Sequence, residues 1–372
     1  MGLNQLDCFK INMKFWKFLA IWPDGDSSRC YSYYSKAFIV VFVFLYYVLF
    51  SINFFYLPGR LDIFIDDLMF YFTDCSVMSK VLTFVVMRKK IVQILDVLES
   101  DMFQPDDNEG KLIIEKAKKL NKLYWKAVAF VSITSNGTLL SPLIVHFIMG
   151  GELTFPVYSY GFFTESFRNL LFYPLYIYQS VGITFHMLYN LNVDTFFLGL
   201  LVYIIAQLDV LDIKLRKVTD ENKLDDVDSE ISSGPTDKDK EAVMKINQCI
   251  VHFHEVASFC ELVQNVFSVT LFVQFSMASC IICVCLMRFT MPAPMDYYLF
   301  LGTYMIVMIL QIMILSATVS RQFKSNMRLF VERTNKPLSI TGGKMFCLSL
   351  PAFTSIMNSA YSFFTLLQQM QD

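Results

Sequence analysis

The chain has 372 residues, of which 55% are hydrophobic and 16% aromatic, and its 37 phenylalanines are too many for the core of one soluble domain. This composition predicts an integral membrane protein. The formal charge of −2 provides no basic face to match phosphate groups, which excludes nucleic acid as a partner.

Seven apolar segments are long enough to cross the hydrocarbon core of a bilayer, which is about 30 Å thick. They cover residues 37–57, 64–87, 127–149, 174–206, 262–287, 297–319 and 345–367. The sequence therefore predicts an all-α membrane protein with seven transmembrane helices in a lipid bilayer.

The second apolar segment contains four charged residues: Asp66, Asp67, Asp74 and Lys80. A charged side chain is costly in hydrocarbon, so this segment must face protein or water for most of its length. We interpret Asp74 and Lys80 as members of structural ion pairs with other helices. A role in permeation or ligand contact is the alternative.

Lysine and arginine are distributed unequally between the two sides of the predicted bundle. Of the 31 such residues, 27 lie in the N-terminal segment and in the segments after spans two, four and six. The alternate side holds Arg60, Arg168 and Arg288, and Lys80 lies within a span. Because positive residues concentrate in cytoplasmic segments, we expect a cytoplasmic N-terminus and an extracellular C-terminus.

The predicted cytoplasmic segments are long. Span four continues beyond Gln207 without an internal proline, so we expect its helix to project into the cytoplasm. Neither glycine nor proline occurs between Pro235 and Pro292, which predicts one helix that begins near Glu241 and includes span five. Residues 219–240 are acidic and poor in apolar side chains, a composition typical of a disordered loop.

No motif indicates catalysis or a cofactor. His252 and His254 do not belong to a known metal-ligand spacing. Cys280, Cys283 and Cys285 lie in an apolar span, where a thiolate is disfavoured, so helix packing is the better interpretation. We therefore expect no enzyme, no cofactor and no metal site.

The last segment begins after helix breakers and then carries no charge. Pro337 and Gly342-Gly343 interrupt any helix that arrives there. Within the apolar span, small or polar side chains recur every three or four positions and so share one helical face: Ser355, Asn358, Ser359, Ser362, Thr365 and Gln369. We favour the wall of a water-filled path for this face, and a small-residue packing seam is the alternative.

Aromatic residues gather in the outer halves of several spans. Examples are Phe70-Tyr71-Phe72 in span two, Tyr178 in span four and Tyr304 in span six. Plain packing between helices accounts for such residues, and a lipophilic pocket with a few tyrosine hydroxyls would carry the same pattern.

The chain resembles the insect odorant receptors over its whole length. The most specific part is the C-terminus, with Lys336-Pro337-Leu338, Thr341-Gly342 and the run from Ser359 to Leu367. The related gustatory receptors end on Thr-Tyr, five apolar residues and Gln-Phe. Here Tyr361-Ser362 replaces Thr-Tyr, which favours the odorant branch. Because the chain lacks the extended third inner segment of the shared co-receptor, it resembles the variable, odorant-tuning subunit.

The resemblance implies an odorant-gated, non-selective cation channel, assembled as a heterotetramer with the co-receptor subunit in the plasma membrane of olfactory sensory neurons. Permeating cations would pass a pore lined by Ser362, Thr365, Gln368 and Gln369. A small volatile ligand, for which we expect an aromatic ring, would bind in the outer half among spans two, three, four and six. The positions that fit this pocket are Leu68, Tyr71, Phe72, Gly137, Ile183 and Tyr304.

The resemblance also implies how the chain is divided. It makes residues 1–36 a cytoplasmic segment, 37–206 spans one to four with the pocket, 207–261 a cytoplasmic segment, 262–367 the pore and anchor spans, and 368–372 an extracellular end.

The alternative function is that of a seven-span G-protein-coupled or gustatory-type receptor. A G-protein-coupled receptor requires an N-terminus outside the cell, which is opposite to the charge bias.

Overall fold

Long helices make up almost all of the described chain. The computed structural model describes residues 5–22, 29–105, 107–150, 153–228, 237–326, 341–342, 346–347 and 350–369. Its elements are η1 (Gln5–Phe9), α1 (Lys10–Phe18), α2 (Arg29–Ile39), η2 (Val40–Leu45), α3 (Tyr46–Asn53), η3 (Phe54–Tyr56), α4 (Leu61–Val86), α5 (Arg88–Glu99), η4 (Asp101–Phe103), α6 (Asn108–Met149), α7 (Glu165–Leu170), α8 (Phe172–Asp228), α9 (Asp237–Phe289), α10 (Met295–Asn326), β1 (Thr341–Gly342), β2 (Phe346–Cys347) and α12 (Leu350–Gln369).

Six helices of the described chain are long and apolar enough to cross a membrane, and they overlap the first six predicted spans. They are Arg29–Tyr56, Leu61–Val86, Asn108–Met149, Phe172–Thr219, Lys240–Phe289 and Met295–Thr318. The all-α membrane architecture is therefore confirmed. The seventh span stays a prediction. α12 has 20 residues, which is long enough to cross a bilayer, but the side chains at its C-terminal end are not among those that the structure describes.

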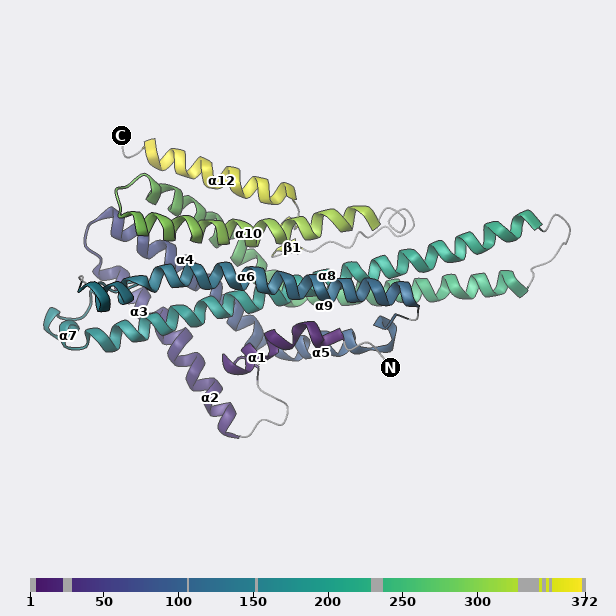
Figure 1. The fold of residues 1–372 in the computed structure, drawn as a ribbon, viewed down its shortest axis with the longest axis horizontal. Coiled ribbons are helices and arrows are strands. Elements are labelled where there is room, and N and C mark those ends of the chain that lie inside the picture. The colour runs from purple at the N-terminus through teal and green to yellow at the C-terminus, as the bar shows by residue number, and fades with distance from the viewer. Residues whose placement is uncertain are drawn as a thin grey trace.

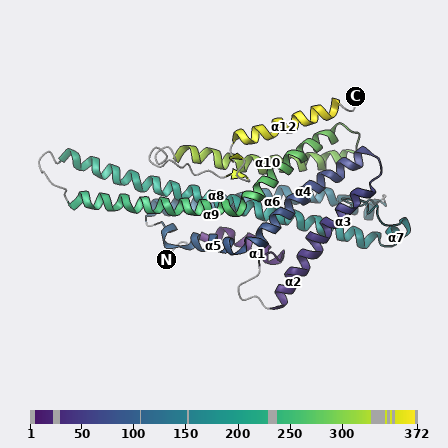
Figure 2. The same cartoon turned by 180° about the vertical axis from the view of Figure 1, so that it is seen from behind.

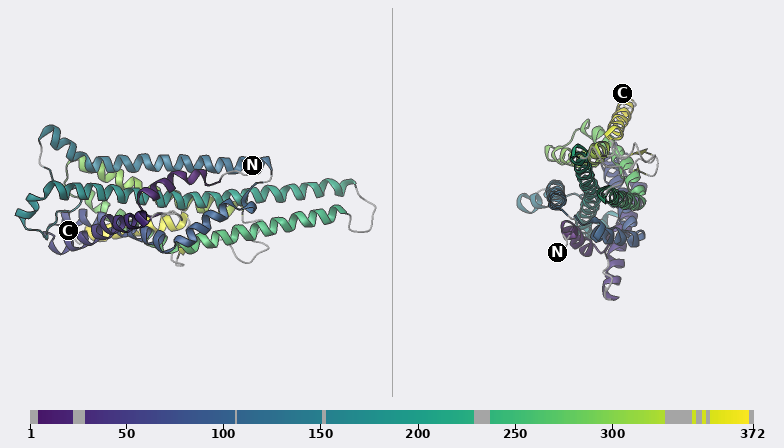
Figure 3. Two further views of the ribbon diagram at one scale, coloured as in Figure 1. Left: turned by 90° about the horizontal axis from the view of Figure 1, so that it is seen from below. Right: turned by 90° about the vertical axis from the view of Figure 1, so that its right-hand side faces the viewer.

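The helices form an elongated bundle from which α8 and α9 project together as an antiparallel pair (Figures 1 and 2). The C-terminal end of α12 and α7 both lie toward the other end of the long axis, on opposite sides of the bundle (Figure 1). Seen from the end, α2 stands away from the rest of the bundle (Figure 3). The membrane orientation of these ends remains a prediction.

The two longest helices contain no proline beyond the first turn. α8 has 57 residues and α9 has 53, which confirms that spans four and five continue as single helices beyond the apolar segment. The disorder predicted for residues 219–240 is wrong at both ends, since α8 continues to Asp228 and α9 begins at Asp237. Polar composition alone does not end a helix, and the first breakers in this stretch are Gly234 and Pro235.

The N-terminal segment is attached to the bundle by packing and by charge. Trp16 and Phe9 are fully buried, and their rings contact Phe196 of α8 at centroid distances of 4.7 and 5.1 Å. Hydrogen bonds from Lys10 and Lys122 lower the pKa of Asp7 to about 2. This charge cluster joins η1 to α6.

Side chains of α8 satisfy the carbonyl groups of a π-helical turn, η2. The Tyr178 hydroxyl donates to the Val41 carbonyl at 2.7 Å, and His186 Nε2 lies 2.8 Å from the Phe42 carbonyl. A π turn shifts the backbone ladder of a helix, so these side chains supply the partners that its carbonyls need in an apolar environment.

Ion pairs account for three of the four charged residues of span two, whereas Asp67 accepts a hydrogen bond from Asn53 Nδ2 at 2.9 Å. Asp74 Oδ1 lies 2.7 Å from His186 Nδ1, and Lys80 Nζ lies 2.6 Å from Asp194 Oδ1. A third pair joins Asp66 to Arg288 of α9 at 2.7 Å. The interpretation of Asp74 and Lys80 as members of structural ion pairs is confirmed, because both partners lie on α8.

The segment before α12 is held by α9. The Gln264 amide donates to the Thr341 carbonyl at 3.1 Å and accepts from the Thr341 backbone N–H at 2.7 Å. The side-chain amide therefore acts as a strand partner for β1. It fixes β1 against the helix that α12 also packs on.

Two glycines of the membrane helices differ in what a larger side chain would meet. A Cβ at Gly182 would lie 2.4 Å from the Tyr46 ring, whereas a Cβ at Gly137 would meet nothing within 4 Å. We expect Gly182→Ala to destabilise the fold by about 1–3 kcal/mol through overpacking. Gly137→Ala should stabilise it by about 0.5–1 kcal/mol, because alanine is the better helix former. Thermal unfolding of the purified variants in detergent measures both, and equal shifts would contradict this packing.

Candidate functional site

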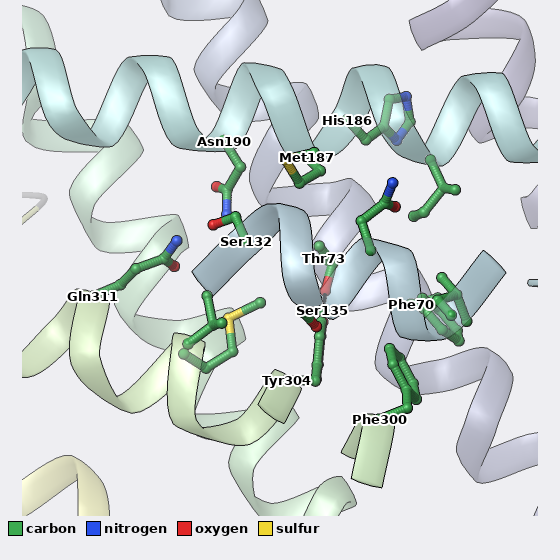
Figure 4. A pocket seen from close by; sticks show the side chains of 15 residues that line it. Phe70, Thr73, Ser132, Ser135, His186, Met187, Asn190, Phe300, Tyr304 and Gln311 are labelled. Carbon is green, nitrogen blue, oxygen red and sulfur yellow. Dashed lines mark hydrogen bonds between the residues drawn. The ribbon is translucent and has the colours of Figure 1, made fainter. Parts of the chain in front are cut away.

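A cavity of about 70 Å³ lies among α4, α6, α8 and α10 (Figure 4). One water needs about 10–15 Å³ by this measure, so the cavity has room for about five waters or one small organic molecule. These four helices are spans two, three, four and six. The cavity therefore lies among the helices at which the sequence resemblance placed the ligand pocket.

One end of the cavity is aromatic. Phe70 of α4 and Phe300 of α10 stack with ring centroids 5.9 Å apart and planes 16° apart. The Tyr304 ring lies 5.7 Å from that of Phe300. Figure 4 shows the two phenylalanines on the same side of the cavity. A planar apolar group of a ligand would gain edge or face contacts here.

The Tyr304 hydroxyl is already engaged. Thr73 Oγ1 donates its single proton to the Met69 carbonyl at 3.1 Å, so the hydrogen bond between Thr73 and Tyr304 must be donated by the tyrosine. The Tyr304 oxygen can then accept from a ligand, but it can donate only after this bond is broken.

His186 contributes mainly carbon to the cavity wall. Its Nε2 must carry a proton, because the Phe42 carbonyl that it contacts can only accept. Its Nδ1 contacts Asp74 Oδ1. Both ring nitrogens therefore have partners on the side away from the cavity.

The other end of the cavity is polar. Ser132 of α6, Asn190 of α8 and Gln311 of α10 gather there (Figure 4). Ser132 and Gln311 are buried, with exposed fractions of 6% and 7%. The Lys80 ammonium donates to Asn190 Oδ1. An apolar cavity with a few polar groups at one end is the general form of a small-molecule site.

Two of the six predicted pocket residues line the cavity, and four do not. Ile183 and Tyr304 line the cavity. Leu68, Tyr71 and Phe72 do not line it. The residues of α4 that face the cavity are Phe70 and Thr73, which lie three positions apart and hence on one helical face.

Tyr71 points to a different neighbour. Its hydroxyl lies 2.8 Å from that of Tyr47 and 3.2 Å from Ser51 Oγ, both on the first span. Each residue of an α-helix is rotated by about 100° from the one before, so a one-residue error in register turns a side chain off the wall. Gly137 also misses the cavity, although its neighbour Asn136 lines it.

The polar end of the cavity was not predicted from the sequence. Ser132 and Asn190 lie in spans three and four, whose rotation could not be fixed, and Gln311 lies two turns beyond Tyr304. Polar residues within apolar spans were the available signal, because such residues face protein or water.

The predicted pore residues lie on α12. Ala360 is fully buried against the bundle, whereas Ser355, Ser359 and Ser362 are exposed in the single chain. Thr365 is half-buried, and its hydroxyl donates to the Ser362 carbonyl at 2.9 Å. The side chains of Gln368 and Gln369 lie outside the described ones. The small polar face of α12 therefore points away from its own subunit, and both a pore wall and a packing seam fit this placement.

One of the two histidines considered for metal binding, His252, has another partner. His252 Nε2 lies 3.2 Å from Gln207 Oε1 of α8. Among the residues that the structure describes, no group of three or more His, Cys, Asp or Glu side chains is placed to hold a metal ion.

Comparison with known proteins shows the family. The sequence model of the 7tm odorant receptors matches residues 61–318 and 316–361. The chain belongs to the odorant receptor family. This receptor is 25% identical to odorant receptor Or1 of Anopheles gambiae over the full length of both chains. It is 23% identical to isoform B of odorant receptor 46a of Drosophila melanogaster over 98% of each chain.

Solved structures show the same fold. The olfactory receptor OR5 of Machilis hrabei, solved in complex with eugenol, superposes with a TM-score of 0.74 at 14% identity. The comparison covers 98% of this chain and 100% of that one. A second structure of OR5 gives a TM-score of 0.72 at 15% identity. This receptor is thus a multi-pass membrane protein with the fold of an insect olfactory receptor.

The aromatic end of the cavity gives a test of where the ligand binds. Replacing Phe300 by Ala removes a ring contact that contributes about 0.5–1.5 kcal/mol beyond burial, so the half-maximal ligand concentration should rise about threefold to tenfold. The measurement is the dose-response curve of cells that express the receptor with a co-receptor.

Tyr71→Phe is the matched control, since Tyr71 lies off the cavity wall. Its dose-response midpoint should stay close to that of the unmodified receptor. A larger shift for Tyr71→Phe than for Phe300→Ala would place the ligand elsewhere.

Proposed function

We propose that this receptor is the odorant-tuning subunit of a ligand-gated, non-selective cation channel, which binds a small volatile in the cavity among α4, α6, α8 and α10. The observation that carries the proposal is the cavity itself. It is lined by four membrane helices, aromatic at one end and polar at the other. Such a site suits a largely apolar molecule with few polar atoms.

The ligand is a small volatile, and an aromatic ring fits between the apolar wall residues at the Phe70 and Phe300 end. The related fold of OR5 was solved with eugenol bound, which supports a small organic ligand here. A molecule of so few heavy atoms reaches only modest affinity, because each atom contributes a limited binding free energy.

The pore is lined by the polar face of α12. Ser362, Thr365 and Gln369 lie at offsets of three and four residues and form one stripe. Uncharged polar groups of this kind ease partly dehydrated cations past without a ring of carboxylates that would select divalent ions. The exposed position of Ser362 in the single chain supports this role, since the face is left for water or another subunit.

The functional assembly is a heterotetramer with the shared co-receptor, in the plasma membrane of olfactory sensory neurons. Thr365 makes this subunit's part of the pore polar, so the apolar gate comes mainly from the co-receptor. Current should therefore require both chains.

Cysteine substitution tests the pore. We expect a charged methanethiosulfonate reagent to block the ligand-evoked current of Ser362→Cys, Thr365→Cys and Gln369→Cys, because a charged adduct in the pore excludes cations. Phe363→Cys and Leu367→Cys, on other faces of the helix, should keep their current.

The recordings use cells that express the receptor with a co-receptor, and the reagent is applied to the unmodified pair as a control. Block at positions 363 and 367 with none at 362 and 365 would show that the opposite face of α12 lines the pore. Ligand-evoked current from the receptor without co-receptor would contradict the proposed assembly.

A further inference from the structure

A buried ion pair fixes one amide at the polar end of the cavity. Lys80 is fully buried, and its ammonium contacts Asp194 Oδ1 at 2.6 Å and donates to Asn190 Oδ1. An ammonium group has donors and no acceptor, so the atom of Asn190 that faces it must be the oxygen. The Asn190 Nδ2 group is consequently turned away from the lysine.

The ion pair is itself held by a third helix. Asp194 Oδ2 accepts a hydrogen bond from Gln274 Nε2 of α9 at 3.2 Å. A buried charge that loses its partner costs several kcal/mol, so Lys80 has little freedom to leave Asp194. The orientation of the Asn190 amide therefore depends on interactions from α4, α8 and α9 together.

Two other polar groups of the cavity have partners within the protein. The Tyr304 hydroxyl donates to Thr73, and Asn136 Nδ2 donates to Thr184 Oγ1 at 3.1 Å. Within the described part of the chain, Asn190 Nδ2 has no hydrogen-bond partner, and Figure 4 shows the side chain directed toward Ser132 across the polar end of the cavity. Its two N–H groups are available to a ligand.

A second, smaller cavity lies beside this network. Its volume is about 10 Å³, which is room for about one water, and Lys80, Asn190, Gln274 and Gln311 line part of it. A ligand cannot enter a space of this size. The ligand therefore meets the network at Asn190, while the lysine and aspartate remain behind it.

We propose that this receptor selects neutral volatiles that carry one hydrogen-bond acceptor, such as a carbonyl, ester or ether oxygen, and that Asn190 Nδ2 donates to that oxygen. The proposal rests on the function proposed above and names the ligand class of the same cavity. The positive charge of Lys80 on the amide oxygen polarises the amide and strengthens its N–H donors. Because Asp194 neutralises Lys80, an ionised ligand would find no free countercharge there.

Two isosteric pairs of probes test the donor. Acetophenone and α-methylstyrene differ by a carbonyl oxygen in place of a methylene group, and benzaldehyde and styrene differ in the same way. Binding is measured on the purified receptor as the ligand-dependent rise in unfolding temperature. The oxygen-containing member of each pair should bind roughly tenfold more tightly, which corresponds to about 1.4 kcal/mol.

Asn190→Leu should bring the affinity ratio of each pair close to one and leave the hydrocarbon's own affinity unchanged or higher. Phe300→Leu is the matched control, because it should weaken both members of a pair and keep their ratio. Should Asn190→Leu fail to fold, Asn190→Asp keeps the contact with Lys80 but removes the donor, and it should abolish the preference in the same way.

Equal binding of both members by the unmodified receptor would overturn the proposal, as would an unchanged ratio in the Asn190 variants. Binding of neither member of either pair would overturn it too. Because this measurement needs no current, the two proposals fail separately. An Asn190-dependent preference without current from the receptor and co-receptor would overturn the channel function and leave the ligand class standing.

Discussion

The need to neutralise charges inside an apolar bundle is the constraint on which the rest of this receptor depends. α4 carries Asp66, Asp74 and Lys80, and each finds its partner on another helix. An unpaired charge at this depth would cost several kcal/mol, which is a large part of the stability of a folded protein. The pairs therefore fix the rotation of α4 against α8 and α9, and with it the direction in which every other side chain of α4 points.

The cavity follows from that rotation. With Asp74 and Lys80 directed at α8, Phe70 and Thr73 face the space between α8 and α10, whereas Tyr71 faces the first span. The same pairs shape the chemistry of the wall. Asp74 engages one nitrogen of His186, and Lys80 turns the amide of Asn190. The charges that make span two look unsuited to a membrane thus orient the side chains that line the cavity.

The sequence allowed the helices to be predicted better than their rotation. The lack of an internal proline predicted that α8 extends beyond its apolar segment, and a run without glycine or proline predicted α9. Helix-forming residues up to Asp228 explain why the expected loop is shorter. The sequence could not predict that Phe70 and not Tyr71 lines the cavity, because residues 70–72 are all aromatic and point in three different directions around the helix. Their assignment depends on contacts such as that between Asp74 and His186, which lie 112 residues apart. On α12, by contrast, the spacing of the polar residues was enough to predict that they share one face, because this needs no knowledge of how α12 packs against other helices.

A ligand can open a gate only if it binds one arrangement of the helices better than the other. In this fold α10 lines the cavity and packs on α12 directly, and α9 connects the same two regions through its polar side chains. Its residue Gln274 ends the network that starts at Asn190 on the cavity wall, and Gln264, ten positions earlier and about 15 Å along the helix, holds Thr341 before α12. A shift of α9 against α8 would therefore change the cavity wall and the base of α12 together. An agonist that acts through Asn190 must favour one of these positions of α9, because binding both equally would leave the pore as it was.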